Sequence, residues 1–137
     1  MNVFLDANVL ISVLNKEYPS YAFTARLLSL DSRRFRLFTT PLCLAIAFYF
    51  AEKKRGNKAA KAKIEILAQH LHIAENKKED VFDVLKNRKI NDFEDGLEYY
   101  AAIKSNFGFI ITEDVDDFYF SEIEVMKPKE FLMTHAV

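Results

Sequence analysis

The stretch Val3-Phe4-Leu5-Asp6-Ala7-Asn8 decides how this chain folds and where its chemistry lies. Its three consecutive apolar residues predict a short strand over residues 2–5 that is buried on both faces, as strands of parallel sheets are. An acid directly after such a strand stands at the carboxyl edge of the sheet, where open α/β sheets bind their ligands. Asp6 is therefore the first candidate for a functional residue.

A second group of acids stands in the last third of the chain. Asp92 and Asp95 open a helix expected to run to about residue 106, and Asp114 and Asp117 follow an apolar strand expected at residues 109–112. Carboxylates that converge on one crevice repel each other unless a cation neutralises them, and hard oxygen ligands suit Mg²⁺ or Mn²⁺. These acids, together with Asp6, predict a metal-dependent phosphodiesterase.

The remaining pattern alternates short strands with helices. Further strands are expected at residues 36–39, 71–73 and 123–126, and further helices at about 7–15, 20–30, 42–54, 58–69, 78–87 and 128–133. Thr40 is expected to cap the helix at 42–54, with Pro41 at its first position. Alternation of this kind predicts an α/β fold with parallel strands. We expect a three-layer α/β/α sandwich around a short, mostly parallel sheet of four to five strands, formed by a single domain over residues 1–137.

Composition narrows the class of protein. The chain has 137 residues, half of them hydrophobic, and a net charge of −1, which is ordinary for one globular domain. Cys43 is the only cysteine, so we expect a small buried residue and neither a disulfide framework nor a cysteine-based zinc site. No signal peptide or membrane-spanning run is evident, and a cytoplasmic location is expected.

The chain resembles the PIN-domain family. Phe4-Leu5-Asp6-Ala7-Asn8-Val9-Leu10-Ile11 is similar to the first PIN motif, and the run from Asp92 through Ile110-Ile111-Thr112 to Asp117-Phe118 is similar to the C-terminal half of the fold. The resemblance implies a ribonuclease that holds Mg²⁺ or Mn²⁺ with Asp6, Asp95 and Asp114. It also implies that Asn8 orients Asp6 or a bound water, and that Asp117 is a ligand or a tether of its own loop.

Asp92 is better explained as a helix cap than as a ligand, because caps and the helix dipole favour a carboxylate there. A basic run offers a surface that could contact RNA phosphates. It consists of Lys53, Lys54, Arg55 and Lys58. Among PIN domains the chain resembles VapC-type toxins of toxin–antitoxin pairs, which implies an antitoxin partner and a homodimer.

One departure from the family pattern favours an alternative function. PIN nucleases usually carry a second acid, a Glu, early in the helix that here begins at Pro41, and Ala45 is the matching position by this reading. The alternative is a degenerate PIN domain that binds nucleic acid or protein with little or no cleavage. A flavodoxin-like receiver or small-ligand α/β module is disfavoured. Such a module would need a glycine-rich phosphate loop, or a phospho-acceptor Asp with a partner Lys after a late strand, and neither is evident in the sequence.

Overall fold

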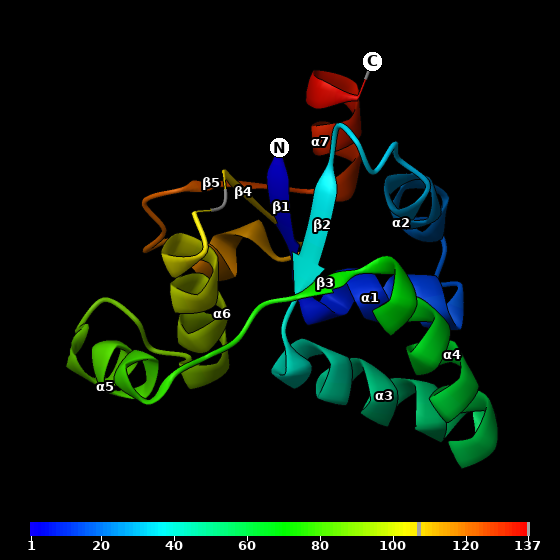
Figure 1. Ribbon diagram of the computed structural model, residues 1–137, viewed down its shortest axis with the longest axis horizontal. Helices are drawn as coiled ribbons and strands as arrows, with labels where there is room; N and C mark the ends of the chain where they lie inside the picture. The colour runs from blue at the N-terminus through cyan, green and yellow to red at the C-terminus, as the bar shows by residue number, and fades with distance from the viewer. Residues whose placement is uncertain (107, 137) are drawn as a thin grey trace.

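The computed structural model describes residues 1–106 and 108–136 and contains one parallel sheet (Figure 1). The five strands lie in the order β3-β2-β1-β4-β5, and each neighbouring pair is parallel. Their bounds are β1 Asn2–Leu5, β2 Arg36–Thr39, β3 His72–Ile73, β4 Phe109–Ile111 and β5 Glu124–Met126. The sheet expected to be mostly parallel is parallel throughout.

Helices join the strands and cover both faces of the sheet. They are α1 Ala7–Asn15, α2 Tyr21–Leu28, α3 Pro41–Arg55, α4 Asn57–His70, α5 Lys78–Lys86, α6 Phe93–Lys104 and α7 Pro128–His135, with a 3₁₀ turn η1 at Val115–Phe118. The chain runs from β1 outward to β3, and α5 and α6 then carry it back past β1 to β4. Because such crossovers are right-handed, the reversal changes the face that the helices cover. Figure 1 accordingly shows α5 and α6 on the opposite side of β1 and β2 from α1, α2 and α4. The expected three-layer α/β/α sandwich is confirmed.

The central strand β1 anchors the core. Val3, Phe4 and Leu5 are completely buried between β2 and β4. Each such side chain contributes about 1.5–3 kcal/mol relative to an exposed one. Since β1 ends at Leu5, this burial holds Asp6 rigidly at the carboxyl edge of the sheet.

Local signals fix the starts of α3 and α6. Thr40 caps α3, because its Oγ1 accepts a hydrogen bond of 3.2 Å from the Cys43 N–H, and Pro41 occupies the first helical position. Asp92 caps α6 in the same way, accepting at 3.0 Å from the Asp95 N–H. Both predicted caps are therefore present, and both place a helix N-terminus near the end of β1.

α6 packs closely against α5 at Gly96. A Cβ atom added at Gly96 would lie 2.5 Å from Val84 Cγ1 and 2.9 Å from Ile90 Cγ2, so only glycine fits this approach. At the far end of α6, Lys104 Nζ binds the carboxylates of Asp80 at 2.5 Å and Asp83 at 2.8 Å. These contacts set the position of α6 and hence of the acids near its start. Among the described helices, none combines the length and the apolar character needed to cross a membrane.

Candidate active site

The candidate site lies where the strand order reverses, at the carboxyl ends of β1 and β4. Asp6 follows β1 directly, and its N–H donates a hydrogen bond of 3.0 Å to the Ile111 carbonyl at the end of β4. Thr112 and Asp114 continue from β4. This reversal is the topological switch point at which open α/β sheets form their binding crevices.

Asp6 is buried and held from two sides. Its Oδ1 accepts at 2.6 Å from the Ala7 N–H as the cap of α1, and its Oδ2 accepts at 2.7 Å from the Thr112 hydroxyl. Only 7% of the residue is exposed. A carboxylate with two fixed donors keeps one orientation, so Asp6 is pre-positioned to bind a further group with its remaining lone pairs.

Asn8 joins α1 to the loop after β4. Its Nδ2 donates to Thr112 Oγ1 at 3.0 Å and to Asp114 Oδ2 at 3.2 Å, and its Oδ1 accepts from the Glu113 N–H at 3.1 Å. The Asn8 amide therefore acts on Asp6 through the Thr112 hydroxyl and fixes the Asp114 carboxylate directly. This geometry is compatible with the orienting role expected for Asn8, which stays a prediction.

Asp95 brings a third carboxylate to the site from the first turn of α6. Burial, followed by the carboxylates of Asp92, Asp6 and Asp117, raises the pKa of Asp95 to about 7. Electrostatic effects of this kind require proximity, so the acids at the start of α6, directly after β1 and in η1 lie close together. Without a cation, part of the Asp95 population is protonated at neutral pH.

Asp114 and Asp117 lie on the exposed side of the group. Desolvation and the carboxylates of Asp114, Asp6 and Asp92 raise the pKa of Asp117. We call Asp92, Asp95, Asp114 and Asp117 the outer carboxylates. In the described part of the chain, none of these four acids has a Lys, Arg or His partner within 4.0 Å. Their repulsion is uncompensated by protein cations, which is the electrostatic setting that a divalent metal relieves.

Glu98, which sequence reasoning missed, adds a buried carboxyl group beside Asp6. It lies three residues after Asp95 on α6, so both side chains project from the same side of the helix. Only 2% of Glu98 is exposed. Burial, and then the neighbouring Cys43 and Asp6, raise the pKa of Glu98 well above its usual range. The spacing from Asp95 was the available signal for this residue.

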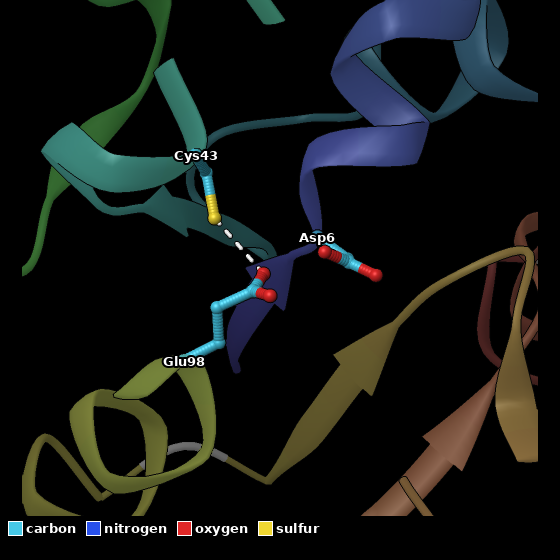
Figure 2. Close-up of side chains that lie close together, drawn as sticks. All are labelled: Asp6, Cys43 and Glu98. Atoms are coloured by element: carbon cyan, nitrogen blue, oxygen red, sulfur yellow. Dashed lines mark hydrogen bonds between the residues drawn. The ribbon is translucent and has the colours of Figure 1, made fainter. Parts of the chain in front are cut away.

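Cys43 completes a compact group with Asp6 and Glu98 (Figure 2). The Cys43 thiol donates a hydrogen bond of 2.9 Å to Glu98 Oε1, and burial raises the pKa of Cys43. One ligand atom from each of the three side chains lies within 4.8 Å of the others. We call these residues the inner cluster. Cys43 is buried as expected, but it contacts the site, whereas the sequence suggested a purely apolar role.

The structure does not support Ala45 as the place from which a missing Glu would reach the site. Ala45 is exposed, and Cys43 is the α3 residue in contact with Glu98. Two residues along an α-helix correspond to a rotation of about 200°, so Ala45 points away from the side that carries Cys43. The half-buried Ile46 and the buried Ala47 lie one turn after Cys43 on its side of the helix.

The basic run lies at the opposite end of α3 from the acids. Lys53, Lys54 and Arg55 occupy the last turn of α3, about 20 Å along the helix from Thr40. Lys54 Nζ donates at 2.6 Å to the Asn15 carbonyl at the end of α1, and Lys53 lies over the Tyr49 ring. Together with the exposed Lys58, these residues form a separate basic surface, and their contact with RNA stays a prediction.

Comparison with protein families gives the decisive match. A profile described as PIN domain matches residues 2–116. The chain belongs to the PIN-domain family. Comparison with curated protein sequences gives no match.

Solved structures share the fold of this PIN domain. A chain of the VapBC2 complex from Rickettsia felis, bound to a DNA fragment from its promoter, is 20% identical with a TM-score of 0.70, over 91% of this chain and 97% of that one. VapC20 from Mycobacterium tuberculosis, described as a Sarcin-Ricin loop cleaving toxin, is 15% identical with a TM-score of 0.72, over 90% and 98%. A chain of VapBC-1 from nontypeable Haemophilus influenzae is 18% identical with a TM-score of 0.69, over 94% and 99%.

The donor set of this PIN domain fits a divalent cation. Carboxylate groups from the end of β1, the start of α6 and the loop after β4 lie close together, and in residues 1–106 and 108–136 no protein cation lies within 4.0 Å of them. Asp6, fixed by Ala7 and Thr112, belongs to the inner cluster and lies beside the outer carboxylates. The arrangement around Asp6 is compatible with the expected metal centre, and the role of these acids as ligands stays a prediction.

Proposed function

We propose that this PIN domain is a Mg²⁺- or Mn²⁺-dependent endoribonuclease. The observation that carries the proposal is the convergence of Asp6, Asp95 and Asp114 at the switch point without compensating cations. A phosphodiester is itself anionic, so this acidic crevice can receive RNA only when the carboxylates are neutralised. When bound, a divalent cation lowers the pKa of a water molecule and offsets charge on the phosphate.

In this proposal each acid of the candidate site has a separate role. Asp6 is the central ligand, because two hydrogen bonds hold its carboxylate in place. Asp95 is the second ligand, and its pKa of about 7 means that cation binding near neutral pH releases part of a proton. Asp114 is the third ligand and is oriented by Asn8. Asp92 supports Asp95 by capping α6, and Asp117 adds negative charge at the rim.

Cleavage of a structured RNA tests the proposal. The wild-type chain should cleave with Mg²⁺ or Mn²⁺ and lose cleavage with a chelator. Asp6→Asn should reduce the rate by on the order of 10³-fold, which corresponds to several kcal/mol of lost stabilisation. Asn remains a good N-cap, so this variant should stay folded. Equal cleavage by Asp6→Asn and wild type would rule out Asp6 as the central ligand.

The alternative, a PIN domain that binds RNA or protein with little cleavage, is favoured by one observation. The α3 residue that lies against Glu98 is a cysteine, and α3 supplies no carboxylate to the group that contains Asp6. Fewer carboxylates imply weaker affinity for Mg²⁺. Calorimetric titration with Mn²⁺ separates the alternatives: undetectable binding together with absent cleavage supports the binding module, and measurable binding with cleavage supports the enzyme.

The partners belong to the same proposal. The likeness to chains of two VapBC complexes supports a toxin role in which a small antitoxin protein binds this chain. We also propose a homodimer in the cytoplasm, with RNA as the substrate. Coexpression with the product of an adjacent small gene, followed by size-exclusion chromatography with light scattering, would show a complex, a homodimer or an isolated monomer.

A further inference from the structure

The inner cluster has a composition that differs from the outer carboxylates. Its three side chains come from different parts of the chain: Asp6 follows β1, Cys43 lies on α3, and Glu98 lies on α6. All three are more than nine-tenths buried, with exposed fractions of 7%, 0% and 2%. Figure 2 shows the Cys43 sulfur and the Glu98 carboxyl pointing toward each other, with Asp6 beside them. The fold therefore gathers one sulfur and two carboxyl groups in a water-poor place.

Nothing else in the described residues neutralises this cluster. The ion pairs found in those residues involve only Asp31, Asp80 and Asp83, so no Lys, Arg or His lies within 4.0 Å of Asp6 or Glu98. Burying acidic groups without a cationic partner is costly, and a bound metal relieves that cost. Asp6 accepts two hydrogen bonds and Glu98 accepts one from Cys43, and one cation shared by the three groups would compensate the charge that these donors leave.

The spacing suits a small tetrahedral cation. The Cys43 Sγ and Glu98 Oε1 atoms are 2.9 Å apart, and the three ligand atoms lie within 4.8 Å of one another. With metal bonds of about 2.3 Å to sulfur and about 2.1 Å to oxygen, neighbouring ligand atoms of a zinc site are about 3.6 Å apart. The one measured separation lies below this value and the others do not exceed 4.8 Å, so small side-chain shifts would complete three ligands.

We propose that Asp6, Cys43 and Glu98 form a site for a borderline-soft divalent cation, Zn²⁺ or its spectroscopic substitute Co²⁺. Thiolate sulfur favours Zn²⁺ strongly over Mg²⁺, whereas an all-oxygen group such as the outer carboxylates favours Mg²⁺ or Mn²⁺. Binding deprotonates the Cys43 thiol, and the released proton passes to the buffer while both sulfur electrons remain on the ligand. The Mg²⁺ or Mn²⁺ site of the proposed function also uses Asp6, so the two cations would compete for that carboxylate.

Cobalt absorption spectroscopy tests the proposal on the purified wild-type chain. Addition of Co²⁺ should produce a near-ultraviolet thiolate-to-metal charge-transfer band that saturates at one equivalent. Zn²⁺ should displace Co²⁺ and abolish the band. Absence of the band in the folded protein overturns the proposal.

Variants assign the ligands. Cys43→Ser should remove the band and weaken Zn²⁺ binding by at least about 100-fold, since the loss of a direct ligand exceeds the 10–100-fold effect of supporting residues. Glu98→Gln preserves the shape of the side chain and should weaken Zn²⁺ binding to a similar degree, which keeps the test valid if Cys43→Ser fails to fold. Asp114→Asn, which changes only an exposed outer carboxylate, should retain the band. Zn²⁺ affinity unchanged in Glu98→Gln, or a band lost in Asp114→Asn, would refute this ligand set.

The result is independent of ribonuclease activity, because no RNA enters the measurement. A band with no RNA cleavage would support the inner site and contradict the nuclease proposal. Mn²⁺-dependent cleavage with no band would do the reverse. The two proposals can therefore fail separately.

Discussion

The inner cluster and the outer carboxylates are neighbouring groups of acids in very different surroundings. Asp6, Cys43 and Glu98 are buried, whereas Asp114 and Asp117 are exposed. Burial is the largest cause of the raised pKa of both Glu98 and Asp95, and for the half-buried Asp95 the repulsion of four further acids adds to it. The difference teaches that position relative to solvent, more than residue type, decides whether an acid here holds a proton or remains available to a hard cation.

The largest expected effect on stability comes from Gly96, which lies between Asp95 and Glu98 and so links both groups. In Gly96→Ala the added methyl would lie 2.5 Å from Val84 Cγ1 and 2.9 Å from Ile90 Cγ2. Overpacking of this kind should lower the free energy of unfolding by about 1–3 kcal/mol. Urea denaturation measures the change.

Gly108→Ala is the matched control, because no atom lies within 4 Å of the Cβ position at Gly108. This control should change the free energy of unfolding by less than about 0.5 kcal/mol. If Gly96→Ala is as stable as the control, the close packing of α6 on α5 does not hold the two groups in place.

The pH dependence of stability distinguishes the outer group. The pKa of Asp95 is about 7 in the folded chain against an ordinary 3.8, so the metal-free wild type loses stability as the pH rises from about 4 through 7. Asp95→Asn lacks this loss and should be more stable than wild type at pH 8, with no such advantage at pH 4. Because solvent screens this half-buried group, the advantage of Asp95→Asn in unfolding free energy at pH 8 should be about 1–2 kcal/mol. Urea titrations in the presence of a chelator measure it.

Glu98→Gln is the counterpart in the inner cluster. The pKa of Glu98 is raised from 4.5, so the advantage of Gln over Glu should likewise grow as the pH rises above about 4.5. Because burial, Cys43 and Asp6 raise the folded pKa of Glu98, wild type should lose stability over this rise in pH whereas Glu98→Gln should not. Parallel pH profiles of wild type and both variants would contradict the contrast between the two groups.

A smaller effect on stability and on Mn²⁺ binding is expected at Asn8, which connects Asp114 with the Thr112 hydroxyl that holds Asp6. Asn8→Ala removes the hydrogen bonds to Thr112, Asp114 and Glu113 and should cost about 1 kcal/mol of unfolding free energy. It should also weaken Mn²⁺ binding about tenfold, because Asp114 loses its orienting donor. Calorimetry and urea denaturation give the two numbers. Thr112→Ser, which keeps the hydroxyl shared with Asp6, should resemble wild type, and a larger loss there than in Asn8→Ala would reverse the assigned roles.

The smallest effect is expected far from both groups, at the basic end of α3. Replacing Lys53, Arg55 and Lys58 by Ala should leave unfolding unchanged within about 0.5 kcal/mol, since all three are exposed. If these three residues contact RNA phosphates, their replacement should make the plot of log RNA affinity against log salt concentration less steep, by up to about 2 in slope. Fluorescence anisotropy with RNA and Asp6→Asn as the background measures the slope. The control is the double variant Arg26→Ala, Lys129→Ala. If the slope of the basic-surface variant equals that of wild type and of this control, the basic surface does not bind RNA.

Much of the fold was predictable from local sequence patterns. The strand at residues 2–5, the helix at 7–15 and the caps at Thr40 and Asp92 are all present in the structure. Such features depend on neighbours within a few residues, so apolar runs and capping chemistry suffice to place them. The position of Asp6 was predictable for the same reason, because a residue that directly follows a buried parallel strand lies at the carboxyl edge of the sheet.

The sequence by itself thus determined the parallel α/β architecture and the acids that follow β1 and β4. Tertiary structure alone decided that Cys43 and Glu98 meet beside Asp6, because that contact joins residues 55 positions apart on different helices. It also decided that Ala45 faces solvent while the lysines at the end of α3 lie far from the acids. Helix rotation and packing, which no local pattern encodes, set both outcomes.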